Sequence, residues 1–147
     1  MPVLMAFDFD GVVVNSIQPL RNVYKDFLSE FGIIGTETEF QSLNGPAITE
    51  IVAYLKEKYE ISEGYSDLLK NYKARLTRAY KEVPLVDHAL STLQNLMDRG
   101  VDLALVTSSI RTEVDVCLCK YGLESAFKHI VTGDDVKNAK PSPDIYL

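Results

Sequence analysis

A short run of apolar residues that ends at two carboxylates constrains the fold of this chain more than any other feature. Residues 3–7 are all apolar and lead directly into Asp8 and Asp10. An apolar run of this length without alternation is typical of a strand covered on both faces, as in an open parallel sheet. Ligands of such sheets bind beyond the carboxyl ends of the strands, and side chains two apart on an extended segment share a face. The pair is a candidate divalent-cation site or acid and base, with a plain Asp-Gly turn as the alternative.

The composition is that of a globular chain with a hydrophobic core. The 147 residues are 46% hydrophobic, which suits one domain or a modest domain with an insertion. Fifteen Lys and Arg against 21 Asp and Glu give a net charge of -6 without a basic run, which argues against a nucleic-acid partner. No apolar run approaches the roughly 20 residues that span a bilayer, and the start lacks the features of a signal peptide. We therefore expect no membrane partner and a cytoplasmic location.

The two cysteines do not indicate a disulfide or a metal site. Cys117 and Cys119 lie two apart in a helical pattern, so their side chains point to different sides of the helix. Reduced thiols fit the cytoplasm, and we expect at least one of them to pack in the core rather than to bind metal.

Apolar spacing predicts an all-helical segment over residues 17–81. A first helix is expected to stop at Gly32, and residues 36–45 form a polar connection. The second helix is expected to carry Pro46 in its first turn, and the third to start with Ser66 as its N-cap.

From residue 84 onward helices and strands alternate. The pattern predicts a helix over about 87–99, a strand over 101–106, a helix over about 111–121 and a short strand over 130–132. Strand, helix, strand, helix, strand is typical of a parallel sheet with right-handed crossovers, so we expect an α/β fold with the helical segment inserted after the first strand.

Two further motifs lie near predicted strand ends. Thr107 and Ser108 follow the second strand, where a hydroxyl and free N–H groups at a helix start can hold a phosphate oxygen, although the hydroxyls of residues 107–109 also suit simple helix capping. Lys140 precedes Pro141 and Pro143 in a rigid non-helical segment, which suits an aimed point charge as well as an ordinary surface lysine.

In this order and on these elements, Asp8, Asp10, Thr107 and Lys140 resemble the motifs of the haloacid dehalogenase superfamily. The sequences of residues 131–136 and 140–146 are similar to those of the subgroup that contains phosphoglycolate phosphatase and beta-phosphoglucomutase.

The resemblance implies a Rossmann-like parallel three-layer α/β sandwich with a small helical cap. It places the core, without its C-terminal strands, at residues 1–14 and 83–147 and the cap at 15–82, with hinges near Asn15 and Val83. Asn15 stands where the family often has Asp, which we treat as a tolerated change at a hinge.

The activity that the resemblance implies is Mg2+-dependent hydrolysis of small phosphorylated metabolites. Asp8 would attack phosphorus and form an aspartyl-phosphate, and Asp10 would act as general acid and then as base. Mg2+ would be held by the Asp8 carboxylate, the Asp10 backbone carbonyl and a later acidic motif, while Thr107, Ser108 and Lys140 would hold the phosphoryl group. Dehalogenases carry Tyr and phosphonatases Ala at the position of Asp10, so the family pattern favours phosphate esters.

The acidic fourth motif of the family has no counterpart after Lys140, because the sequence stops at Leu147. We therefore expect a truncated form with weaker Mg2+ binding and impaired activity. The acidic segment at residues 133–135 precedes the lysine and is expected to be a loop rather than a metal site. Without a neighbouring strand, the segment from Val3 to Phe7 would be an apolar edge through which the chain can self-associate.

Two alternatives stay open. One is a sugar-phosphate mutase of the same superfamily, although residues 16–31 lack the histidine that the mutase motif has there. The other is a non-catalytic fragment or binding protein. The substrate is not readable from the sequence: residues 44–45 and Arg21 are candidate cap contacts, and the cap tyrosines are expected to pack between helices.

Overall fold

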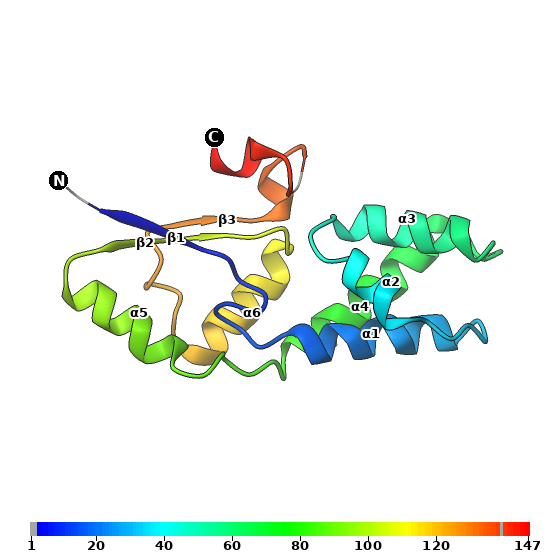
Figure 1. Cartoon of the computed structure of the whole chain (residues 1–147), viewed down its shortest axis with the longest axis horizontal. Coiled ribbons are helices and arrows are strands. Elements are labelled where there is room, and N and C mark those ends of the chain that lie inside the picture. The colour runs from blue at the N-terminus through cyan, green and yellow to red at the C-terminus, as the bar shows by residue number, and fades with distance from the viewer. Residues whose placement is uncertain (1–2, 139) are drawn as a thin grey trace.

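The structure is a computed structural model that describes residues 3–138 and 140–147, and it consists of a three-stranded sheet with helices on one side and a group of four helices at one end (Figure 1). In the described part, no helix is both long and apolar enough to cross a membrane. The elements in chain order are β1 Leu4–Phe7, α1 Ile17–Ser29, α2 Glu37–Ser42, α3 Ile48–Lys58, α4 Tyr65–Tyr80, α5 Ala89–Asp98, β2 Asp102–Val106, α6 Arg111–Tyr121, β3 His129–Val131 and two short 3-10 helices, Gly133–Asp135 and Pro143–Tyr146. We refer to the group of four helices, α1 to α4, as the cap, after the expected cap segment.

The sheet is parallel and has the order β1-β2-β3. Phe7 pairs with Leu105, and Val106 pairs with Val131, so the carboxyl ends of all three strands lie at the same end of the sheet. Helices α5 and α6 make the connections between the strands and lie on the lower side of the sheet in Figure 1, with the C-terminal segment above it. The predicted α/β class with parallel strands is confirmed.

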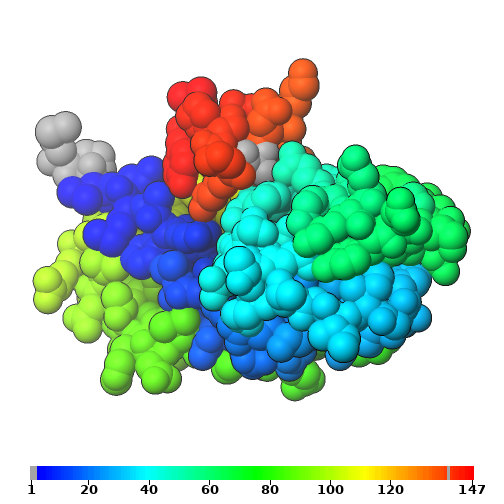
Figure 2. Space-filling view, turned by 45° about the vertical axis from the view of Figure 1, so that its right-hand side comes forward, coloured from blue at the N-terminus to red at the C-terminus, as the bar shows by residue number. Residues whose placement is uncertain are grey.

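The prediction that the first strand is covered on both faces is wrong for the described residues. Val3, Leu4 and Met5 are exposed at 55%, 56% and 40%. The physical reason is that β1 lies at the edge of the sheet, which confirms the expected apolar edge, and that among the described residues it pairs with β2 alone, so no second neighbouring strand covers its other side. Figure 2 shows this blue segment at the surface, beside the red C-terminal segment. The expected self-association through this edge stays a prediction, as does the cytoplasmic location.

Aromatic packing and one buried carboxylate hold the cap together. The rings of Phe27 in α1 and Tyr72 in α4 meet edge to face with centroids 5.0 Å apart, so these two long helices share a core. Glu39 in α2 is buried, where it accepts hydrogen bonds from the Tyr24 hydroxyl and, at 2.6 Å, from Lys58. Tyr24 and Tyr72 are thus packing residues, as expected for cap tyrosines, while the proposed cap boundaries at residues 15–82 stay a prediction.

Three details of the helix predictions are wrong. Residues 37–42, expected as part of a polar connection, form α2, because Thr36 caps its N-terminus by accepting from the Glu39 N–H. Pro46 lies outside α3, because Ala47 is extended and donates its N–H to the Glu50 carboxylate at 3.1 Å. Ser66 is not an N-cap, since α4 already begins at residue 65 after Gly64.

The two chain segments that join cap and core run side by side. The Asn15 N–H donates to the Pro84 carbonyl at 2.7 Å, and the Val86 N–H donates to the Val13 carbonyl at 3.0 Å. The predicted hinge positions near residues 15 and 83 therefore lie together at one joint.

The cysteines are both free, with Cys117 buried and Cys119 exposed. The expectation that at least one of them packs in the core is confirmed.

Gly133→Ala should destabilise the fold by about 1–3 kcal/mol, because a Cβ at this position would collide with the Ser108 backbone carbonyl. Urea denaturation followed by circular dichroism measures the loss. Gly64→Ala is the matched control, since its Cβ would meet only the Asp67 carboxylate at an ordinary 3.7 Å and its φ is -60°. Equal denaturation midpoints for the two variants would contradict the close approach of Gly133 to the backbone of Ser108.

Candidate active site

A tight turn after β1 presents two carboxylates to the same cavity. Phe9 is fully buried, its carbonyl accepts from the Val13 N–H at 2.9 Å, and Gly11 has a φ of +77° that favours glycine. The phenyl ring lies in the core, and Asp8 and Asp10 on either side of it in the sequence both line the cavity beyond the carboxyl ends of the strands. The structure thus brings together the two carboxylates that the sequence singled out.

Lys140 joins the turn to the end of β2. Its ammonium donates to the Val106 carbonyl at 2.9 Å and lies 3.1 Å from Asp8 Oδ1. The Phe9 N–H also donates to Asp8 Oδ1, at 2.8 Å, whereas no hydrogen bond to Asp8 Oδ2 occurs among the described residues. The carboxylate is therefore held through one oxygen, and the other is available to a ligand.

The hydroxyl residues after β2 do not cap the next helix, contrary to the alternative that the sequence allowed. The N-cap of α6 is Ile110, so the hydroxyls lie too early in the chain. Instead, Thr107 is buried and its Oγ1 accepts from the Ser109 N–H at 3.0 Å. Ser108 Oγ is buried, lines the cavity and has no hydrogen-bond partner in the described part of the chain.

The acidic segment at residues 133–135 has a structural role, as expected for a loop. Asp134 accepts the Arg111 N–H at 2.7 Å, which satisfies a free donor at the start of α6. Asp135 accepts from the N–H and hydroxyl of Thr132 at 2.7 and 2.8 Å, and these bonds, helped by the Arg111 guanidinium, lower the pKa of the Asp135 carboxyl. These carboxylates belong to the packing of this loop.

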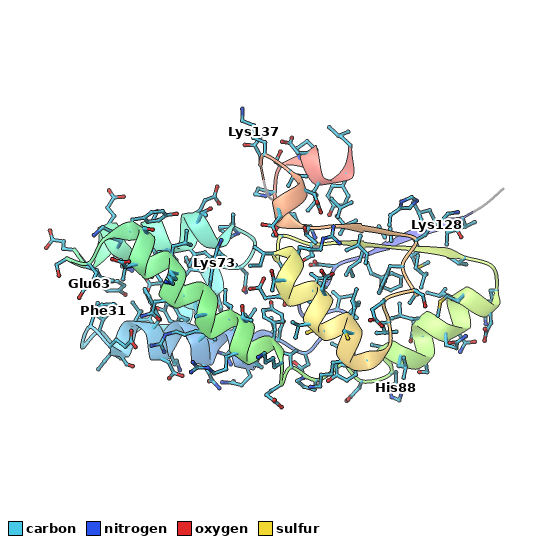
Figure 3. The ribbon with its side chains drawn as sticks, turned by 180° about the vertical axis from the view of Figure 1, so that it is seen from behind. Phe31, Glu63, Lys73, His88, Lys128 and Lys137 are labelled. Carbon is cyan, nitrogen blue, oxygen red and sulfur yellow. The ribbon has the colours of Figure 1, made fainter. Side chains whose placement is uncertain are left out.

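Asp10 is held from two sides by residues that the sequence analysis did not select. The Tyr80 hydroxyl donates to Asp10 Oδ1 at 2.5 Å, and the Ser109 hydroxyl donates to Oδ2. Tyr80 is the last residue of α4, and its ring stacks on Phe9 at a centroid distance of 6.2 Å. In the view from behind, α4 runs from the outer end of the cap, where Glu63 lies, to the side of α6 (Figure 3). A cap helix thus ends on the second carboxylate.

The position of Tyr80 in an amphipathic helix hides this contact from periodicity analysis. The available signal was that a buried tyrosine, unlike phenylalanine, requires a partner for its hydroxyl. Burial raises the pKa of the Tyr80 hydroxyl well above its usual value, and the adjacent Asp10 carboxylate adds to the rise. The tyrosine therefore acts as a hydrogen-bond donor at every physiological pH.

Glu113 is a second residue that the sequence did not indicate. It lies in the first turn of α6, is fully buried and lines the cavity, and neither carboxyl oxygen makes a hydrogen bond within the described residues. Burial raises the pKa of Glu113 to about 8, with further increases from Asp134 and Asp10, which nearby backbone N–H groups offset only in part. At neutral pH its side chain is mainly an uncharged acid.

These residues surround a cavity of about 300 Å³ between the core and the cap. The core side contains Asp8, Asp10, Thr107, Ser108, Ser109, Glu113 and Lys140, and the cap side is formed by α1 to α4 and the loop at residues 44–46. Of the two expected cap contacts, the segment at residues 44–45 lines the cavity and Arg21 does not. Arg21 is paired with Glu37 at 2.7 Å and lies over the Phe40 ring.

The oxygen ligands present fit a Mg2+ ion that keeps most of its water. No group of three or more His, Cys, Asp or Glu side chains with metal-binding geometry occurs among residues 3–138 and 140–147. Both Asp10 oxygens accept hydrogen bonds, which leaves Asp8 Oδ2 as the free carboxylate oxygen of the pair. Mg2+ is commonly bound through one or two carboxylates together with waters and substrate phosphate.

Glu113→Gln should remove a pH dependence of stability. The wild-type carboxyl titrates near 4.5 when unfolded and near 8 when folded, so the folded chain holds one more proton between these values and loses stability as the pH rises through them. The free energy of unfolding of the variant minus that of the wild type should therefore be larger at pH 8.5 than at pH 5, by on the order of 3 kcal/mol. Urea unfolding at both pH values measures this, with exposed Glu57→Gln as control; a pH-independent difference would show that Glu113 is charged in the fold.

Comparison with known proteins agrees with this geometry. The model of the haloacid dehalogenase-like hydrolase family matches residues 5–147. A phosphorylated carbohydrates phosphatase of Thermotoga maritima is 32% identical over an alignment 149 positions long, gaps included, that covers 96% of this chain and 66% of the relative. The chain thus spans about two thirds of the length of the curated relatives it matches.

Solved structures show the same fold. A Thermotoga maritima protein described as a candidate beta-phosphoglucomutase has 28% identity and a TM-score of 0.73, covering 99% of this chain and 68% of that one. The HAD-hydrolase YfnB of Bacillus subtilis bound to magnesium has 17% identity and a TM-score of 0.70, covering 99% and 71%, and supports the fold alone. The motifs, the parallel sheet and the family match lead to one conclusion: this chain belongs to the haloacid dehalogenase-like hydrolase family.

Proposed function

We propose that this chain carries the reaction centre of a Mg2+-dependent phosphatase of small phosphorylated metabolites that works through an aspartyl-phosphate. One observation carries the proposal: one carboxylate oxygen of Asp8 has no hydrogen-bond partner among the described residues, while the other lies 3.1 Å from the Lys140 ammonium in the cavity that Asp10 also lines. A carboxylate aimed into a cavity beside a fixed cation suits attack on an anionic phosphoryl group.

In the first step, Asp8 attacks phosphorus and forms a new P–O bond as the ester P–O bond breaks. Asp10, in its protonated form, gives its proton to the departing oxygen, so that the product leaves as an alcohol. Lys140 and the hydroxyl of Ser108, which has no partner among the described residues, would contact the phosphoryl oxygens. Thr107 fixes the backbone at Ser109 by accepting its N–H.

In the second step, Asp10 takes a proton from water as the water oxygen attacks phosphorus and the bond to Asp8 breaks. The products are inorganic phosphate and free Asp8, with Asp10 protonated again for the next cycle. Tyr80 and Ser109 hold Asp10 in position in both steps, because each hydroxyl donates to a different carboxylate oxygen.

Mg2+ belongs to this proposal on chemical grounds. When bound, it would supply positive charge that screens the phosphate from the Asp8 carboxylate. Asp8 would hold it through the carboxylate oxygen that does not attack phosphorus, with the Asp10 backbone carbonyl as the second ligand implied by the family resemblance. Lys140 alone cannot neutralise a phosphate dianion next to the Asp8 carboxylate.

The mutase alternative has support from one solved structure at 28% identity. A mutase needs a second phosphate position on the sugar, and the cap side of the cavity has no cation among the described residues. The phosphatase therefore remains the preferred proposal, and a non-catalytic role is the outcome if no phosphoryl ligand binds.

Asp8→Asn should abolish Mg2+-dependent hydrolysis of phenyl phosphate, with a decrease in kcat of at least about 10³-fold, because the amide is not a nucleophile. It should also abolish formation of a beryllofluoride adduct, which fluorine NMR detects without turnover. Asp115→Asn, at an exposed position of α6, is the control and should retain both. Hydrolysis or adduct formation by the Asp8 variant at the wild-type level would refute the nucleophile assignment.

Tyr80→Phe should lower kcat roughly tenfold and leave KM within about threefold, because it removes one hydrogen bond to Asp10 and keeps the ring against Phe9. The pH profile of kcat should shift as well, since a purely structural role of the hydroxyl would leave the titration of the acid and base unchanged. Tyr65→Phe, at the outer part of the cap, serves as control. An unmoved pH profile with normal kcat would rule out positioning by Tyr80.

A further inference from the structure

The two sides of the cavity have opposite character. The core side carries the carboxylates, hydroxyls and Lys140 described above. The cap side is apolar and includes Leu20, Phe40, Leu43, Ile48, Ile51 and Leu76. The phosphoryl group belongs at the polar side, so the remainder of a substrate faces the apolar side.

Positive charge is confined to the phosphoryl end. Among the described lining residues, Lys140 is the single cation, and it is already engaged by Val106 and Asp8. No Lys or Arg of the cap lines the cavity within the described residues. Three basic residues of the cap are instead paired within it: Arg21 with Glu37, Lys58 with Glu39 and Arg75 with Glu30.

The polar groups that the cap does contribute are uncharged. Asn44 lies in the loop before α3, and Tyr72 lies on α4. Asn44 can exchange a hydrogen bond with a hydroxyl or carbonyl group, but it cannot neutralise an anion. A second phosphate or a carboxylate would therefore lose its water without gaining a counter-charge, which is strongly unfavourable. An uncharged, largely apolar group would gain from burial against the leucine and isoleucine side chains.

We propose that the preferred substrates are phosphate monoesters whose leaving group is uncharged and mainly apolar, and that esters carrying a second anionic group are rejected. This inference rests on the proposed phosphatase function and narrows its substrate class. The inference follows from the apolar cap side of the cavity. A site that cleaves pyrophosphate or binds a bisphosphate would instead require positive charge for the second phosphate.

Ligand binding tests this preference without turnover. Propylphosphonate and 3-phosphonopropionate differ only in a terminal methyl group against a carboxylate, and calorimetry with the 147-residue chain at fixed free Mg2+ gives both affinities. Propylphosphonate should bind at least about tenfold more tightly. Equal affinities, tighter binding of 3-phosphonopropionate or binding of neither phosphonate would overturn the proposal.

Hydrolysis provides the second measurement. The value of kcat/KM for phenyl phosphate should exceed those for phosphoglycolate and for pyrophosphate by at least about tenfold. A chain that hydrolyses phosphoglycolate or pyrophosphate as well as phenyl phosphate is a phosphatase for which this inference is wrong. A chain that hydrolyses none of the three lacks the proposed function, and the phosphonate affinities then decide the binding preference separately.

A charge placed on the cap side should change the preference. Leu43→Lys adds a cation at a half-buried lining position and should raise the phosphoglycolate to phenyl phosphate ratio of kcat/KM at least about fivefold. Ile34→Lys adds the same charge at a cap residue that is 92% exposed and absent from the lining, and its ratio should match wild type. Ile48→Lys is the second variant if Leu43→Lys unfolds, and a ratio unchanged in a folded lining variant would contradict the proposal.

Discussion

The parallel pairing of β1 with β2 is the constraint on which the rest of the site depends. Because Phe7 is in register with Leu105, Asp8 emerges beside Val106, whose carbonyl accepts a hydrogen bond from Lys140. The lysine comes from a segment far along the chain, yet its ammonium lies 3.1 Å from the Asp8 carboxylate, because both residues lie at the carboxyl end of the sheet. A parallel sheet thus brings the Asp8–Asp10 turn, the segment after β2 and Lys140 together at its carboxyl end, although they are far apart in the sequence.

The joint between cap and core adds a second level of organisation. The two linkers are hydrogen bonded to each other, and α4 ends at Tyr80 directly on Asp10. The Cys117 thiol also donates to the Tyr80 carbonyl at 3.3 Å, so the helix end is fixed to α6 as well. A movement of α4 would therefore alter the surroundings of the carboxylate to which we assign proton transfer. In this fold the cap is coupled to the proposed reaction centre through a hydrogen bond as well as by enclosing it.

The electrostatic design of the cavity is one-sided. Charged and hydroxyl groups gather on the core side, where a phosphoryl group would be bound, and the buried Glu113 side chain is mainly uncharged at neutral pH. The cap side offers apolar surface, and its basic residues named above are paired with cap carboxylates. In our proposal the core therefore supplies the chemistry, while the substrate preference depends on the cap.

The sequence by itself determined the parallel α/β class, the order of the elements apart from α2 and the two 3-10 helices, and the choice of Asp8, Asp10, Thr107, Ser108 and Lys140 as candidates, because apolar periodicity and the order of motifs can be read along the chain. It could not identify Tyr80 or Glu113, since a tyrosine at the end of an amphipathic helix and a glutamate in a first helical turn have ordinary local patterns. It also overestimated the burial of β1, because coverage of a strand depends on its neighbours in space. Only the tertiary structure decided which hydroxyls contact Asp10, because Tyr80 and Ser109 lie 70 and 99 positions from it in the sequence. It also decided which cap side chains line the cavity, because these come from four different helices and the loop before α3.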